Sequence, residues 1–148
     1  MKKIFLISCV AAALTFGVVA VSTRAQKQTG AQHDSAKHAD GGIIQVEVND
    51  ASDAASRDQI RQHLSHIAHA FAAGDFDTPM LVHDRVPPGV PVMQRLKSEI
   101  KYSYEETASG ARVRIETKNA DALAAIHDFL RFQIEDHQTG DPVEVINH

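Results

Sequence analysis

Apolar and polar residues alternate along three segments of the chain, and this period of two predicts β-strands. The segments are residues 44–48, 100–105 and 112–116, and the last two are separated by a turn expected at 107–110. Each segment has one apolar face and one polar face. The resulting sheet therefore needs to be covered on one side only.

Two other segments repeat their apolar residues at helical spacing. Ser56 and Gln59 form a capping box before the first helix, and Gly74 provides its stop signal. Asn119 is the expected cap of the second helix, which ends at Gly140. The two apolar stripes consist of Ile60, Leu64, Ile67 and Phe71, and of Leu123, Ile126, Leu130 and Ile134.

The order of elements is β-α-β-β-α, with or without a final strand that uses Val143 and Val145. This order predicts an α+β fold. The expected architecture is a two-layer, ferredoxin-like sandwich with both helices on one face of a mostly antiparallel sheet. A long proline-rich insertion, residues 75–98, follows the first helix; its prolines argue against a helix or a central strand. Because the insertion is also apolar, it is expected to pack as an ordered arm over one end of the sheet.

The first 25 residues have the layout of a secretory signal peptide. Lys2 and Lys3 precede an uncharged apolar stretch at 4–21, and cleavage is expected after Ala25 or, alternatively, after Ala20. The stretch is long enough for an uncleaved membrane anchor to be the competing interpretation. Residues 26–42 are polar and are predicted to form a flexible tether, followed by a single α+β domain at 43–148. The protein is therefore expected in the periplasm or outside the cell.

Charge and cysteine content exclude several classes of function. The formal charge is −4, and it becomes −7 without residues 1–25, which carry three basic residues and no acid. A chain this acidic is not expected to bind nucleic acid. The only cysteine, Cys9, lies within the signal segment. The mature chain is thus expected to have no disulfide and no thiolate ligand.

Nine histidines are the one unusual feature of the composition. His63 and His66 lie three residues apart on the first helix, so their side chains are neighbours. His127 lies at a similar height on the second helix if both helices run side by side over the sheet. The sequence therefore predicts a zinc or copper site formed by His63, His66 and His127. The competing interpretation is a structural cluster in which these imidazoles donate to backbone carbonyls or carboxylates.

A second candidate metal site lies in the proline-rich insertion. Met80, His83 and Met93 offer the thioether and imidazole ligands that suit copper. Methionines in an apolar segment more commonly serve as packing residues. The two interpretations are left open at this stage.

Three functions follow from these patterns. The first is a non-enzymatic envelope protein that binds zinc or copper for buffering or delivery. The alternative is a metal-independent interaction module that presents the second helix, with Phe129 and Phe132, and the proline-rich insertion to another envelope protein or to a second copy. The third is a small enzyme with a pocket where the insertion meets His83 and His127. No catalytic residue is assigned, because the chain lacks the nucleophile elbow, phosphate-binding loop and zinc-protease motifs.

Overall fold

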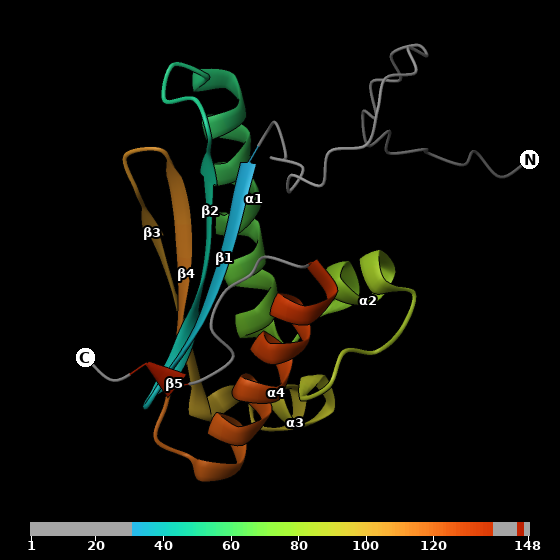
Figure 1. The fold of residues 1–148 in the computed structure, drawn as a ribbon. Helices are drawn as coiled ribbons and strands as arrows, with labels where there is room; N and C mark the ends of the chain where they lie inside the picture. Colours follow the sequence, from blue (N-terminus) through green and yellow to red (C-terminus); the bar gives the residue numbers. More distant parts are fainter. Residues whose placement is uncertain (1–30, 138–144, 147–148) are drawn as a thin grey trace, which may run out of the picture.

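The computed structural model describes residues 31–137 and 145–146. One layer is a sheet, and α1 and α4 cover the same face of it (Figure 1). The strands are β1 (Ala31–His38), β2 (Gly41–Val48), β3 (Ile100–Glu106), β4 (Gly110–Thr117) and β5 (Val145–Ile146). The helices are α1 (Ala54–Ala73), α2 (Asp77–His83), α3 (Val90–Arg95) and α4 (Ala120–His137), with a single 3-10 turn, η1 (Lys97–Glu99), before β3. The predicted α+β class and the antiparallel sheet are confirmed.

The strands lie in the order β3-β4-β2-β1-β5. The first four strands are antiparallel, and the short β5 runs parallel to β1. A ferredoxin-like sheet would place the final strand directly beside the first strand of the unit. Here β1 lies between β2 and β5, so the chain has one strand more than the predicted order.

The segment predicted to be a polar tether contains this additional strand. Residues 31–38 pair with β2 along their whole length, from Ala31 opposite Val48 to His38 opposite Gly41. Ser35 and Lys37 are buried although both are polar. The prediction of a tether was therefore wrong from residue 31 onward, and residues 26–30 lie outside the described part of the chain. Composition was misleading because backbone pairing, and not apolar side chains, holds β1 in place.

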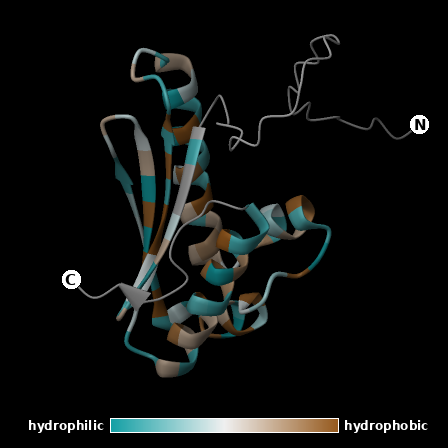
Figure 2. Cartoon of the chain, in the orientation of Figure 1, coloured by the Kyte–Doolittle hydropathy of each residue, from teal (hydrophilic) through white to brown (hydrophobic). Residues whose placement is uncertain are grey.

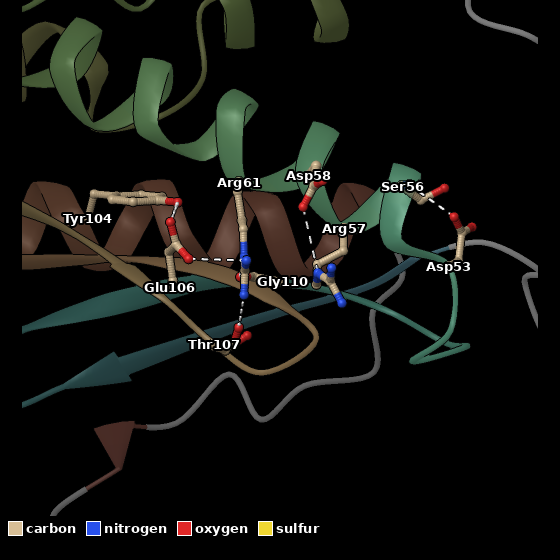
Figure 3. Close-up of polar contacts among 9 residues, drawn as sticks. All are labelled: Asp53, Ser56, Arg57, Asp58, Arg61, Tyr104, Glu106, Thr107 and Gly110. Carbon is tan, nitrogen blue, oxygen red and sulfur yellow. Dashed lines mark hydrogen bonds and ion pairs between the residues drawn. The ribbon is translucent and has the colours of Figure 1, made fainter.

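Helix α1 is fixed at both ends and along its length by polar contacts. Its N-cap is Asp53, whose side chain accepts a hydrogen bond from the Ser56 amide at 3.0 Å, so the helix begins earlier than the predicted capping box. Gly74 ends it in a left-handed conformation, as predicted. In between, the Arg61 guanidinium donates to the carbonyls of Thr107 and Gly110 (Figure 3). Arg61 thereby ties α1 to the β3–β4 turn.

The proline-rich segment forms two short helices, which the sequence analysis had excluded. Pro79 lies in the first turn of α2 and Pro91 in the first turn of α3. The amides of a first turn have no partner within the helix, so a proline costs little there. The left-handed Gly89 precedes α3 and brings the backbone against α4, since a Cβ at this position would lie 2.0 Å from the Ala125 carbonyl oxygen. The segment packs on α4.

One core joins the sheet to α1, α3 and α4. Phe129 and Phe132 on α4 fall outside the predicted apolar stripe, so either exposure as a partner surface or cover by the 75–98 segment was open; they are 1% and 8% exposed. Phe129 makes edge contacts with Phe71 and Phe76, whose rings stack at 4.3 Å. The second alternative holds, because Phe76, His83 and Arg85 of the 75–98 segment pack against these two rings. These aromatic rings are core and are not a partner surface.

Candidate functional site

The predicted site of three histidines is not assembled by the fold. His63 and His66 lie on exposed positions of α1, whereas His127 lies on α4. Within residues 31–137 and 145–146, no group of three or more His, Cys, Asp or Glu side chains is placed to hold a metal ion. The equal-height argument failed because the part of α1 that carries His63 lies near the β3–β4 turn, which Arg61 contacts, whereas His127 lies at the β1–β2 turn. These two turns are at opposite ends of the sheet.

His127 instead supports the turn between β1 and β2. Its Nε2 lies 2.8 Å from the carbonyl oxygen of His38 and 3.1 Å from that of Gly41. A carbonyl only accepts, so Nε2 carries the proton and donates to both. This is the structural alternative to metal ligation, in which a half-buried imidazole satisfies backbone acceptors.

Met80, His83 and Met93 also have separate roles. Met93 is fully buried in the core, and Met80 is only partly buried on α2. Both ring nitrogens of His83 have partners that are not methionine: Nδ1 lies 2.6 Å from Asp136 Oδ2, and Nε2 lies 3.3 Å from Gln133 Nε2. The copper-type site is therefore not formed in this arrangement.

A different cluster forms where the end of α2 meets the end of α4. His83 is its centre, with a side chain only 3% exposed. Because an amide nitrogen only donates, Nε2 of His83 accepts from Gln133, and the proton on Nδ1 is donated to Asp136. The carboxylate of Asp136 therefore fixes the orientation of the imidazole ring. We call the five residues His83, Arg85, Gln133, Asp136 and His137 the α2–α4 clasp.

Charge and aromatic contacts complete the clasp. Arg85 donates to Asp136 Oδ1 at 3.0 Å and lies over the ring of Phe132 at 4.6 Å. The hydrogen bond from His83 lowers the pKa of the Asp136 carboxyl, and the positive charge of Arg85 lowers it further. Asp136 thus joins the last residue of α2 and one residue of the α2–α3 connection to α4.

His137 packs against this pair as a second imidazole. Its ring centroid lies 5.1 Å from that of His83. Burial lowers the pKa of His137, and His83 lowers it further, while Asp136 acts in the opposite direction. Two imidazoles this close oppose each other's protonation. The clasp is consequently a hydrogen-bonded junction in which burial and the neighbouring ring disfavour the protonated form of His137.

Three large apolar side chains lie exposed beside the clasp. Leu81, Val82 and Val86 are 81%, 65% and 56% exposed, and they are the only exposed large hydrophobic residues in the described part of the chain. Hydrophobic positions occur on α2, at the outer side of the molecule (Figure 2). We call these three residues the α2 apolar surface. A cluster of this kind, next to charged residues, is typical of protein contact sites.

Sequence reasoning had singled out His83 but missed the residues around it. No role was predicted for Arg85 or Gln133. A signal for them existed, because Gln133 and Asp136 lie three residues apart and share one side of α4. The side of α4 that would receive His83 could not be derived from the sequence.

Comparison of the chain with protein-family models, with curated proteins and with solved structures found no match. Among the helices that the structure describes, none has the length and apolar character needed to cross a membrane.

Proposed function

We propose that the protein is an interaction module of the cell envelope that binds another protein through the α2 apolar surface. The observation that carries this proposal is the exposure of Leu81, Val82 and Val86, since a folded chain normally buries such residues in its own core. The partner is an apolar segment or face of a second protein. Burial of the three side chains would supply the apolar centre of the contact.

The exposure is not the result of a loosely attached segment. His83 follows Leu81 and Val82 directly and is held by Asp136 and Gln133 of α4. Beyond Val86, Pro87 is fully buried and Gly89 lies against α4. The backbone is thus anchored on both sides of the apolar residues. A pre-ordered surface loses less conformational entropy on binding than a mobile loop does.

The surroundings of the apolar residues resemble the rim of an interface. Asp84 is exposed, and the Arg85 side chain is 60% exposed while still paired with Asp136. Charged groups at a rim stay in contact with water and select partners of complementary charge. This arrangement favours a protein partner over a small ligand, which would need a concave site.

We infer that the module acts after export, on the strength of Lys2, Lys3 and the apolar stretch at 4–21. These residues lie outside the described part of the chain. N-terminal sequencing of the protein from its native host should find a start between residues 21 and 27. An intact Met1 on membrane-bound protein would instead identify an anchor.

Site-specific photo-crosslinking in the native host tests the interaction. A photoreactive side chain at position 82 should give a discrete adduct, and the same group at Gln62, an exposed residue of α1, should not. Once the adduct is identified, Leu81→Asp/Val82→Asp should weaken the purified complex by about tenfold or more. Gln62→Asp should leave it unchanged. Equal crosslinking from both positions, or full affinity of the double variant, would reject the proposal.

A second candidate function is binding of zinc or copper by His63 and His66, for buffering or delivery. The placement of the two residues favours it: they lie three apart on α1, where their side chains are neighbours. Desolvation and then the neighbouring His66 lower the pKa of His63, which disfavours the protonated form that competes with a metal ion. Calorimetry with zinc and copper on protein without a polyhistidine tag tests this. Heat that His66→Ala removes and His69→Ala retains would support the pair, whereas no heat at neutral pH would exclude it.

The strand order also supports an inference about architecture. We infer that β2, α1, β3, β4, α4 and β5 keep a ferredoxin-like plan into which β1 has been added beside β2. The direction of β5 supports this, because it runs parallel to β1 and hence opposite to β2. A chain lacking residues 1–38 should unfold if β1 is integral to the core.

A further inference from the structure

We propose that two copies of this chain form a dimer by pairing their β3 strands antiparallel, with the two-fold axis at Ser103. The strand β3 is the last in the sheet and pairs only with β4. Within residues 31–137 and 145–146, no segment pairs with its outer edge. An open edge of this kind is a template for a further strand.

The charges on β3 are self-complementary about Ser103. Lys101 and Glu105 lie two residues before and two residues after it, on the polar face of the sheet. In an antiparallel pair centred on Ser103, Lys101 of each copy therefore lies opposite Glu105 of the other. A lysine on an edge strand ordinarily discourages pairing. Here the second copy supplies the carboxylate that offsets this charge.

Lys101 and Glu105 also form ion pairs with residues of β4 in the same copy. Arg112 contacts Glu105 at 2.6 Å, and Lys101 contacts Glu116 at 3.6 Å. Across the proposed dimer, two rows of charged side chains would form. Each row would contain Arg112 and Glu105 of one copy, followed by Lys101 and Glu116 of the other. Opposite charges on directly opposed residues stabilise a strand pair, whereas like charges destabilise it.

The opposite face of β3 supports the same register. Tyr102 and Tyr104 are both partly buried and pack against the core. With Ser103 at the centre, Tyr102 of one copy lies opposite Tyr104 of the other, and aromatic cross-strand pairs are favourable. A shift by two residues would instead place Glu105 opposite Glu99, or Lys101 opposite Thr107. Of these registers, only the one centred on Ser103 places opposite charges opposite each other on the polar face and tyrosines opposite each other on the apolar face.

Charge reversal and mixing test the proposal in solution. Light scattering should give twice the mass of one chain, which is 16.1 kDa when all 148 residues are present. Lys101→Glu and Glu105→Lys each place like charges opposite each other twice, so each should raise the dimer dissociation constant by about tenfold or more. An equal mixture of the two variants should restore a dimer, since every opposed pair in the heterodimer is then of opposite charge. A monomeric wild type, or variants that remain dimers, would overturn the proposal.

Disulfide trapping tests the position of the axis. In a Cys9→Ser background, Ser103→Cys should crosslink under mild oxidation, because directly opposed Cα atoms of antiparallel strands lie about 4.5–5.5 Å apart, within reach of a disulfide. Ser98→Cys, in η1, is the matched control: its counterpart would lie about 34 Å away, at roughly 3.4 Å for each of ten residues of offset. Crosslinking of Ser98→Cys alone would overturn the register. Leu81→Asp/Val82→Asp should leave the dimer intact, which separates this interface from the α2 apolar surface.

Discussion

Nδ1 of His83 lies 2.6 Å from Oδ2 of Asp136, although 53 residues separate the two in the chain. The first residue ends α2 and the second lies in the last turn of α4. A single pair of side chains makes this contact, and Arg85 donates a hydrogen bond to the same carboxylate. This junction holds the proline-rich segment on α4 and so determines where Leu81 and Val82 are presented.

Removal of the His83 imidazole should loosen this junction. His83→Ala is expected to lower the free energy of unfolding by about 1–3 kcal/mol, because a buried side chain and two hydrogen bonds are lost. His66→Ala, at an exposed position of α1, should change it by about 0.5 kcal/mol or less. Urea unfolding of both variants measures the difference. Equal effects would show that His83 does not anchor the segment.

Acid should weaken the same region through His137. Its pKa in the folded protein is lowered from the ordinary value of 6.5, first by burial and then by His83. The unfolded chain therefore binds the proton more readily. Stability should be full above about pH 6.5 and should fall as the pH decreases through the lowered pKa of the folded state.

Melting curves recorded between neutral pH and pH 5 measure this dependence. His137→Gln should reduce the fall in melting temperature, and the control His69→Gln should retain it. An unchanged profile for His137→Gln would mean that protonation of another group determines acid stability.

Two glycines with similar backbone angles should differ in their tolerance of alanine. Gly89 and Gly74 have φ values of +82° and +81°. A Cβ at Gly89 would meet the Ala125 backbone oxygen at 2.0 Å, whereas at Gly74 it meets only the flexible Lys97 side chain at 3.0 Å. Gly74→Ala should cost about 1 kcal/mol, the usual penalty of the left-handed conformation. Gly89→Ala should cost clearly more in thermal unfolding; equal costs would mean that α3 does not pack tightly on α4.

The register of β4 makes a further prediction. Val113 is fully buried, whereas the Arg112 side chain is 41% exposed beside Glu105. Val113→Asp should destabilise the fold by about 3–5 kcal/mol, because it buries an unpaired charge. Arg112→Asp should cost about 1 kcal/mol or less, as surface ion pairs contribute little. Chemical denaturation distinguishes the two, and similar losses would contradict the assigned faces.

The periodic elements could be predicted because their apolar residues recur at the spacing of the buried face. Val113 and Ile115 alternate with Arg112 and Arg114, and this alternation survives in the sheet with the expected face buried. Gly74 and Asn119 end and begin helices as expected, since their roles depend only on local backbone geometry. The strand β1 lacked such a signal. The dipeptide Asp40-Gly41, where the turn meets β2, was the only local cue to a hairpin.

The proline-rich segment shows a second limit. A proline excludes a helix interior but not a first turn, and the position of Pro79 within its turn became known only with the start of α2. Burial of Phe129 and Phe132 likewise depended on where this segment packs. The sequence by itself determined the α+β class, the two long helices and the apolar face of each central strand, because these follow from local periodicity. Only the tertiary structure decided the partners of His83 and His127, because those contacts join residues fifty or more positions apart. The packing of separate elements leaves no periodic pattern in the sequence from which it could be predicted.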